Sequence, residues 1–402
     1  MRLRGVCSRL VPLFFLVTGV SAFQPTMIPS AFAQGATAAQ DPPGLTELVG
    51  QLEVQYEDSA RGARLLHFIE TGGQRLRLQF NGPAPDLLTG ARVRARGRLD
   101  GATLQLSSDA GSVQALSAGV ANTFGGQRVI VILVNFLNDT SQPYTVSAAA
   151  STTFQQTSGF FDENSYGQTS LSGDVYGWFT LAMNNTCDTS QIALLADQAA
   201  ANAGAALSTY ARRIYAFPYT SNCGGWWGLG SVGGNPSRSW INGTYALKVV
   251  AHELGHNFGA YHSHSRPCDT SGCTSVEYGD DHDVMGNPSA GHMNAFQKER
   301  LGWLNYNLSP PIQEVSAAGS YRVDPMSVRS TAAKALKILK SIDSSGRRTW
   351  YYVESRAALG YDNKVAPGVI VHTGTDASPD SSYEIDLAPS TTTGDFVLDA
   401  GQ

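Results

Sequence analysis

The stretch that decides the fold is HELGHNFGAYH, residues 252–262, which has the form H-E-x-x-H-x-x-G-x-x-H. The run before it, TYALKVVA (244–251), carries apolar residues at helical spacing, so the sequence predicts a helix over 245–258. Residues at i and i+4 share one face of a helix, which places His252 and His256 about one turn apart. Two imidazoles at that spacing are close enough to share an ion.

The residues after the predicted helix complete a candidate metal site. Gly259 lets the chain leave the helix with positive φ, and the turn brings His262 back as a third ligand. Three neutral imidazoles with one open position indicate a catalytic Zn²⁺, whereas structural zinc sites fill all four positions. Glu253 lies beside the first ligand, where its carboxylate can take the proton of the zinc-bound water. The competing interpretation, three core histidines and a surface glutamate, requires a chance match of roughly 10⁻⁵.

The extended motif resembles that of the metzincin metallopeptidases, which also have a methionine turn beneath the zinc. Met285, in DVMGNP, follows His262 by twenty-three residues and fits that turn. The surrounding sequence is similar to the gametolysin-type peptidases and their bacterial relatives over residues 160–178, 228–234, 239–265 and 277–304. Two C-terminal segments, YYVESRAALGYD and PGVIVHTG, are also similar to the region that follows the catalytic domain in these families. The resemblance implies an endopeptidase that cleaves extracellular or cell-wall protein.

Two departures from related families are visible. Matrix-type proenzymes silence their zinc with a cysteine, but no cysteine lies between Cys7 and Cys187, so any latency must be steric or use another ligand. His67 is the only histidine of that region, and a half-buried strand histidine is its ordinary interpretation. Some metzincins stabilise the oxyanion with a tyrosine two residues after the methionine. This sequence has Asn287 there, which leaves that group unassigned.

The N-terminus predicts export. Three arginines precede an apolar run, 10–20, that is too short to span a bilayer and fits a secretory signal with cleavage after Ala22 or Ala33. Removing Cys7 leaves an even set of four cysteines, typical of disulfides in an oxidising compartment. Three pairings exist, and the short 268–273 loop favours Cys187–Cys223 with Cys268–Cys273. A zinc site from the four is the alternative, weakened by the lack of a C-x-x-C pair.

Composition sets the broad class. The 402 residues are 42% hydrophobic, enough for real cores, so global disorder is excluded. The 15% of charged residues and 42 glycines suit a secreted protein rich in strands and turns. A net charge of −5 gives no general attraction for nucleic acid or anionic membrane. We expect a monomer with protein or peptide substrates, no nucleic-acid partner and no membrane insertion once the signal is cleaved.

Four segments follow from the patterns along the chain: a signal peptide (1–33), a small β-rich module and pro-region candidate (34–118), a zinc peptidase domain (119–308) and a β-rich C-terminal region (309–402). In the third, strands 128–136, 171–181 and 212–219 alternate with helices near 146–161 and 189–208, which predicts an α/β fold. The fold class is therefore a metzincin-like domain, a mixed twisted sheet with an active-site helix, between two β regions. The Gly- and Trp-rich segment 223–243 reads as irregular.

Several weaker candidates surround the motif. Leu229, Gly230, Ser231 and Val232 could form the edge strand that pairs with an extended substrate, although glycine there also suits a plain loop. His264, His282 and His292 read as loop residues near the cleft, with a second metal as the alternative. Four acidic residues could bind Ca²⁺ but lack EF-hand spacing, so a solvated acidic loop is favoured: Glu277, Asp280, Asp281 and Asp283.

Together these features predict a secreted or extracellular zinc endopeptidase, with the periplasm and the cell surface as other locations. The alternative is a cell-surface or wall-binding protein whose β modules carry the function beside a subsidiary or inactive peptidase domain. Glu253 has no role as a ligand, so its presence favours catalysis.

Overall fold

The computed structural model describes residues 45–59, 62–106, 111–119, 121–286, 291–389, 391 and 394–399. These all belong to one compact unit, Gly44–Gln402. The signal segment with Cys7 and both cleavage sites lies outside the described residues, as does Asn287. Among the described residues, no helix is both long and apolar enough to cross a membrane.

The described strands lie in three sheets. The first contains β1 (Thr46–Ser59), β2 (Gly62–Thr71), β3 (Gln74–Gln79), β4 (Arg92–Asp100), β5 (Thr103–Leu106), β6 (Val113–Ser117), β7 (Gly125–Phe136), β8 (Thr169–Leu181), β9 (Arg212–Phe217), β10 (Trp226–Ser231) and β11 (Ser237–Asn242). The second contains β12 (Ser263–Arg266), β15 (Ile312–Val315), β16 (Ala335–Ile342), β17 (Arg348–Arg356), β18 (Gly368–Thr375) and β19 (Ser378–Ile385). The third is a ribbon of β13 (Cys268–Asp269) and β14 (Gly272–Cys273).

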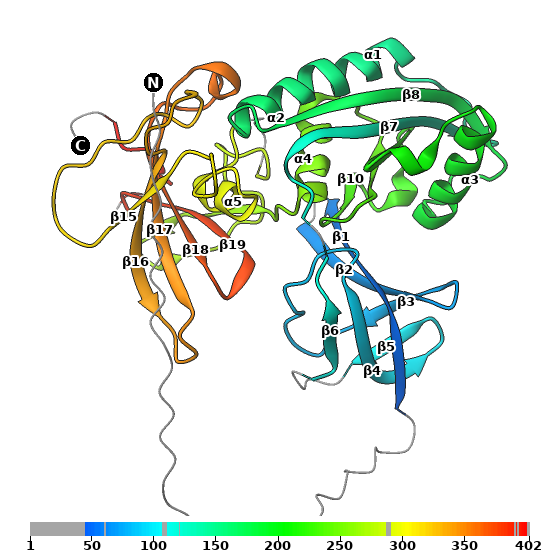
Figure 1. Cartoon of the computed structure of the whole chain (residues 1–402), viewed down its shortest axis with the longest axis horizontal. Coiled ribbons are helices and arrows are strands. Elements are labelled where there is room, and N and C mark those ends of the chain that lie inside the picture. The colour runs from blue at the N-terminus through cyan, green and yellow to red at the C-terminus, as the bar shows by residue number, and fades with distance from the viewer. Residues whose placement is uncertain are drawn as a thin grey trace, which may run out of the picture. The chain divides into compact units, whose positions relative to one another are not determined.

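Helices flank the first sheet (Figure 1). They are α1 (Val146–Ser151) and α2 (Ser158–Asn164), joined through the π-helical turn η1 (Thr152–Thr157), then α3 (Thr189–Asn202) and α4 (Leu247–Phe258). The last helix, α5 (Ala295–Arg300), packs against β17 and β18 of the second sheet. Short 3-10 turns are η2 (Leu207–Thr209), η3 (Ser221–Cys223) and η4 (Gly360–Asp362). A mixed, sheet-rich architecture with few helices results, as expected for a peptidase domain.

The central part of the first sheet has the order β8-β7-β9-β11-β10. β7 pairs in parallel with β8 and β9, β9 pairs in parallel with β11, and β10 runs antiparallel to β11. Along β7, Val129, Val131 and Leu133 pack in the core that contains α4, while the intervening residues pack in the core that contains α3. A strand covered on both faces needs a continuous apolar run, and RVIVILVNF supplies it.

The second sheet joins the segment that carries the histidine motif. Its edge strand β12 begins at Ser263, directly after His262, and pairs in parallel with β19. The other strands come from the last quarter of the chain. The sheet therefore contains residues from both sides of position 308, and the domain boundaries themselves stay predictions.

Most predicted elements of the central segment are present, but the glycine-rich segment 223–243 is not irregular: it forms β10 and β11. In the C-terminal region, predicted to be β-rich, two stretches with a strand-like pattern, 320–326 and 395–400, do not form strands in the described residues. SYRVDPM has no strand, and DFVLDA contributes only an isolated bridge at Leu398. Backbone pairing decides these cases, because strand propensity acts only where a partner edge is available.

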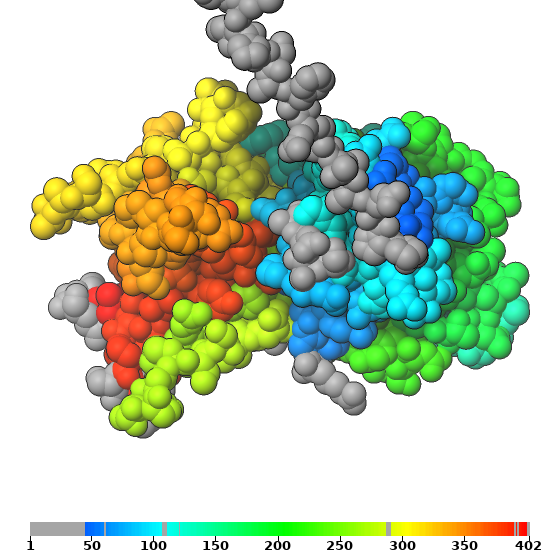
Figure 2. Space-filling view, turned by 90° about the horizontal axis from the view of Figure 1, so that it is seen from below, coloured from blue at the N-terminus to red at the C-terminus, as the bar shows by residue number. Residues whose placement is uncertain are grey.

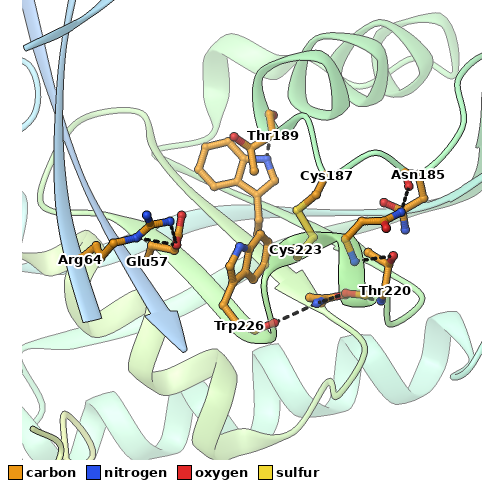
Figure 3. The surroundings of a disulfide bond; sticks show 11 residues. Glu57, Arg64, Asn185, Cys187, Thr189, Thr220, Cys223 and Trp226 are labelled. Carbon is orange, nitrogen blue, oxygen red and sulfur yellow. Dashed lines mark hydrogen bonds and ion pairs between the residues drawn. A yellow bond between two sulfur atoms is a disulfide. The ribbon is translucent and has the colours of Figure 1, made fainter. Parts of the chain in front are cut away.

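Both cysteine pairs of the favoured arrangement are disulfides. The Cys187–Cys223 bond connects the residues just before α3 to η3, three residues before β10 (Figure 3). Nearby, Asn242 Nδ2 donates to Trp226 O at 2.8 Å, which fixes the start of β10 on β11. The bond therefore anchors one end of the strand that passes over α4.

Candidate metal centre

Helix α4 places His252 and His256 on one face, as the i, i+4 spacing predicts. Residues Val249–Phe258 are all buried. The helix ends at Gly259, whose φ of 109° lies in the left-handed region, and the chain then returns His262 to the same point. The Nε2 atoms of His252 and His262 are 3.3 Å apart. The structure thus brings the three predicted ligands together.

The other ring nitrogens settle how these imidazoles are protonated. His252 Nδ1 donates to Val284 O at 2.8 Å, and His256 Nδ1 donates to Ala260 O at 2.9 Å. A carbonyl oxygen can only accept, so each Nδ1 carries a hydrogen, and in the neutral ring Nε2 is then the atom that presents a lone pair. His262 Nδ1 lies 2.6 Å from Glu277 Oε1, which gives it the same orientation. Three lone pairs aimed at one point repel one another unless a cation lies between them.

The methionine turn packs beneath the helix. Met285 is fully buried, and a Cβ at Gly255 would overlap its sulfur, so only glycine fits the helix at that point. Lys248 Nζ holds the turn by donating to the carbonyl oxygens of Val284 and Gly286 at 2.5 Å each. The Val284 carbonyl also orients His252, so the turn positions one of the three imidazoles.

Glu253 lies between α4 and β10. It is buried, and a Cβ at Gly228 would overlap its Oε1 atom, so β10 approaches the carboxyl closely because residue 228 is glycine. Burial and the neighbouring charge of Asp58 raise the pKa of Glu253 well above its ordinary value. A carboxyl group with that environment holds a proton readily, as a general base must after it has accepted one.

A residue that the sequence did not single out completes the centre. Asp58, at the end of β1, places Oδ1 2.8 Å from His262 Nε2 and Oδ2 3.1 Å and 3.4 Å from the Nε2 atoms of His252 and His256. Burial raises the pKa of Asp58, but His262 and His252 lower it by a larger amount, so the net pKa is well below its ordinary value. The carboxylate is the fourth group around the point where the imidazoles converge.

Strand β1 delivers Asp58 by pairing with β10. The two strands, labelled in Figure 1, run antiparallel. Tyr56 lies opposite Gly230, and Asp58 lies opposite Gly228. In the space-filling view the N-terminal residues, blue to cyan, lie against the green central segment (Figure 2). The proposed substrate strand, Leu229 to Val232, is therefore buried and already paired on that side. Tyr56 adds a stacked contact with His256, with ring centroids 4.8 Å apart.

His67 takes no part in the centre. It lies in β2, is 5% exposed, and packs edge-on against Phe80. Burial lowers its pKa to about 4. The ordinary interpretation of a strand histidine is therefore the right one.

The remaining histidines of the motif region are buried partners of carboxylates rather than open loop residues. His264 lies 3.1 Å from Asp380, His282 lies 2.6 Å from Glu384, and His292 lies 2.8 Å from Glu163. Two of these carboxylates belong to the C-terminal sheet. These histidines therefore help hold that sheet against the metal-binding segment.

The acidic loop before the methionine turn is only partly solvated, because Glu277 and Asp281 are exposed as predicted but the other two carboxylates are not. Asp280 and Asp283 are fully buried. Asp280 accepts hydrogen bonds from Ser263 at 2.6 Å and His372 at 2.8 Å, and Asp283 accepts from Met285 N at 2.7 Å. Tertiary packing of the second sheet removes water from this loop, which no local pattern reveals.

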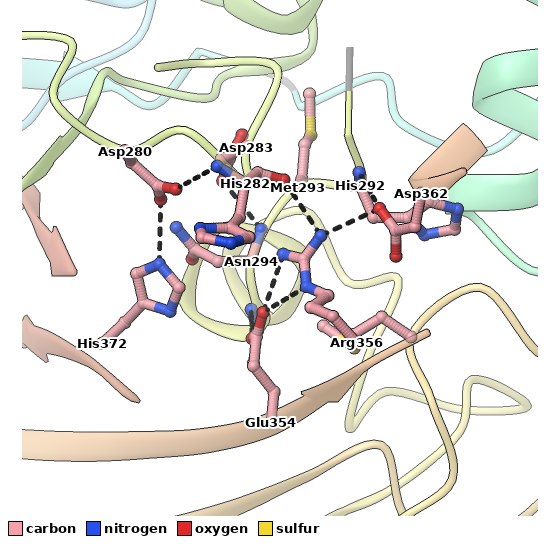
Figure 4. A network of polar contacts seen from close by, with 12 residues as sticks. Asp280, His282, Asp283, His292, Met293, Asn294, Glu354, Arg356, Asp362 and His372 are labelled. Carbon is pink, nitrogen blue, oxygen red and sulfur yellow. Dashed lines mark hydrogen bonds and ion pairs between the residues drawn. The ribbon is translucent and has the colours of Figure 1, made fainter. Parts of the chain in front are cut away.

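A buried polar network continues from this loop into the second sheet (Figure 4). Arg356, on β17, pairs with Glu354 at 2.7 Å and Asp362 at 3.0 Å, and also donates to the carbonyl of His282 at 3.0 Å. All of its charged partners are buried. The network fixes the loop that leads into Met285.

Two imidazoles and a glutamate on one helix, a third imidazole from the turn after it and a methionine beneath them are typical of a metallopeptidase centre. Residues 117–341, more than half of the chain, match the gametolysin peptidase M11 family, and the chain belongs to that family. Membership implies a metal ion and a protein or peptide substrate. No curated protein matches the chain.

Sequence reasoning found the three histidines and Glu253 because they share a short motif. It missed Asp58 and Tyr278, and it misjudged Glu277, because these residues reach the centre only through the pairing of β1 with β10 and the packing of the 277–283 loop. For Glu277 and Tyr278, the local sequence offered only that two adjacent polar residues precede the methionine turn in EYGD.

Proposed function

We propose that the chain is a secreted zinc endopeptidase that uses Glu253 as its general base. The observation that carries the proposal is the convergence of three imidazole lone pairs, fixed by their Nδ1 hydrogen bonds, beside the buried carboxyl of Glu253. The buried Nε2 atom of His256 has no hydrogen-bond partner among the described residues, as expected of a nitrogen that binds a metal ion.

The donor set and its spacing support zinc. Ligands 2.0–2.1 Å from a tetrahedral zinc stand about 3.3–3.4 Å from one another. The measured separations around the centre, between 2.8 and 3.4 Å, lie near that value, with Asp58 as the fourth group. The order of the central sheet, with an antiparallel strand over the histidine helix, supports the metzincin-like arrangement.

When bound, zinc supplies a positive charge that polarises the scissile carbonyl and acidifies water. The chain's residues do the rest. Glu253 accepts a proton from the attacking water, whose oxygen bonds to the carbonyl carbon while the carbonyl π electrons move to oxygen. As the C–N bond breaks, Glu253 returns the proton to the amine nitrogen, leaving a carboxylic acid and an amine.

The variant Glu253→Gln tests this mechanism. It should retain one zinc per chain and lose at least about 10³-fold in kcat, because a carboxamide cannot accept the proton. Glu314→Gln, at an exposed position of β15, is the matched control. Full proteolysis by Glu253→Gln would refute the mechanism. Chelator-insensitive or absent cleavage of a denatured protein by the mature chain would favour the wall-binding alternative.

We further infer that residues 34–118 form a pro-region that keeps the enzyme latent. Two contacts support this: β1 pairs along β10, where an extended substrate would lie, and Asp58 occupies the fourth position of the centre. A side-chain carboxylate, not a peptide carbonyl, meets the histidines, so the module itself is not positioned for cleavage. N-terminal sequencing of the active secreted form should begin beyond residue 117, and a start near Gln34 would refute the inference.

Secretion and a monomeric state complete the proposal. The two disulfides support an oxidising compartment, since such bonds are rare in reducing cytosol. The signal-like N-terminus supports export through a cleaved leader. Calcium is not needed to account for the acidic loop, since Asp280 and Asp283 are satisfied by hydrogen bonds within the protein.

A further inference from the structure

Asp58 shows where the oxygens of a reacting peptide group would lie. A carboxylate has two oxygens on one carbon, as does the adduct that forms when water adds to a peptide carbonyl. Its Oδ1 lies 2.8 Å from His262 Nε2, and its Oδ2 lies 3.1 Å from His252 Nε2. The Asp58 oxygens therefore stand in for the carbonyl oxygen and the attacking water oxygen.

One hydroxyl group of the described residues donates to this carboxylate. Tyr278 Oη lies 3.1 Å from Asp58 Oδ1. Tyr278 comes from the loop between His262 and Met285, not from the module that carries Asp58, so it would remain at the centre if the module were removed. The hydroxyl approaches from the peptidase side of the site.

The position of Tyr278 is fixed by its surroundings. Its ring packs on His262, with centroids 4.3 Å apart. The preceding residue, Glu277, bonds the same histidine, and the following residue, Gly279, fits so closely that a Cβ there would overlap Ser265 Oγ. Tyr278 itself has φ of 55°, in the left-handed region that a tyrosine rarely adopts. Residues held in such conformations cluster at functional sites because the surrounding packing must enforce them.

We propose that Tyr278 is a catalytic residue that donates a hydrogen bond to the oxygen on which negative charge develops during peptide hydrolysis. This rests on the proposed function. As the water oxygen bonds to the carbonyl carbon and its proton moves to Glu253, the π electron pair settles on the carbonyl oxygen. The Tyr278 hydroxyl stabilises that charge without transferring its own proton, and the bond weakens again when the C–N bond breaks.

A different role would explain the same contact: Tyr278 could serve only to hold Asp58 in the latent chain. The two roles predict opposite results once Asp58 is removed. An oxyanion donor still matters to turnover in an Asp58→Ala chain, whereas a latch for Asp58 does not.

The experiment compares Tyr278→Phe with Tyr278 in the full-length, zinc-loaded Asp58→Ala chain. The control is Tyr215→Phe, a buried tyrosine of β9 that also donates to a carboxylate, Asp197, at 3.0 Å. We expect Tyr278→Phe to lower kcat on a quenched peptide about 100-fold with little change in KM, and to retain one zinc per chain. Tyr215→Phe should leave kcat unchanged.

Binding supplies a second readout that does not depend on turnover. A phosphinic peptide carries two oxygens on a tetrahedral phosphorus, whereas a mercaptoacyl peptide of the same sequence offers zinc a single sulfur. Tyr278→Phe should weaken the phosphinic peptide about 10- to 100-fold and leave the thiol peptide unchanged. Equal kcat and equal phosphinic affinity would overturn the proposal. If the mature chain, freed of residues 34–118, also cleaves no peptide, the proposed function fails, and the phosphinic affinities still decide the role of Tyr278.

Discussion

Replacing Asp58 by alanine should uncover the metal centre of the full-length chain. The carboxylate is the fourth group around three imidazoles, and its side chain is 11% exposed. Removing one partner of a buried charged cluster costs about 3–5 kcal/mol. At about 1.4 kcal/mol for each factor of ten, the open form should gain about 10²- to 4 × 10³-fold in population. The β1–β10 pairing is unaffected, so access should increase more for small ligands than for peptides.

Acetohydroxamate and a quenched peptide measure these two kinds of access. Acetohydroxamate is smaller than one residue and should bind zinc-loaded Asp58→Ala at least about 100-fold more tightly than the unaltered chain, whereas peptide cleavage should rise less because β1 still covers β10. Asp86→Ala is the control, since Asp86 belongs to the same module but is exposed and faces Arg300 at 3.5 Å. Unchanged acetohydroxamate affinity in Asp58→Ala would refute the role of Asp58, and loss of zinc would show that Asp58 is needed to retain the metal.

Three further perturbations test other parts of the structure. Gly228→Ala places a Cβ on Glu253 Oε1 and should lower kcat at least about tenfold with zinc retained, while Gly126→Ala, where a Cβ meets nothing within 4 Å, should be neutral in the same kinetic assay. Replacing both cysteines of Cys187–Cys223, which are 36 residues apart, by serine should lower the free energy of unfolding by about 4 kcal/mol. The same replacement at Cys268–Cys273, which are 5 residues apart, should lower it by about 2 kcal/mol. Urea unfolding of the two double variants measures both changes. Burial lowers the pKa of His372, but the Asp280 carboxylate raises it by more, so that the net pKa is about 9. The charged His372 therefore stabilises the fold by about 3 kcal/mol below pH 6.5, and this stabilisation is lost as the pH rises through 9.

Each of these predictions has a contrary outcome. Equal turnover of Gly228→Ala and Gly126→Ala would mean that β10 does not confine Glu253. Equal losses for the two disulfides would argue against loop length as the cause. For the pH dependence, His372→Gln should abolish the fall in unfolding free energy between pH 7 and 10, and His67→Leu should not, because His67 with a pKa of about 4 is neutral throughout that range. A fall that persists in His372→Gln would assign it to another group.

Periodicity and spacing were sufficient where neighbours in sequence are neighbours in space. The i, i+4 histidines and Glu253 share one helical turn, Gly259 supplies the reversal to His262, and the continuous apolar run of β7 marks a strand buried on both faces. The short cysteine loop favoured the disulfide pairing that is observed. These features depend on local geometry, which the order of residues largely dictates.

What only the tertiary structure decided concerns groups far apart in the chain. Asp58 meets His262 across 204 positions because β1 adds to β10, and a one-residue slip of that pairing would turn its carboxylate to the other face. The segment 223–243 forms strands because partner edges are available on both sides. Asp280 is buried because the C-terminal sheet packs His372 against it. Such contacts depend on register and on which surfaces meet, and neither leaves a periodic trace in the sequence. The motif from His252 to His262 thus predicted the metal centre, whereas the fold decided what covers it and which hydroxyl faces it.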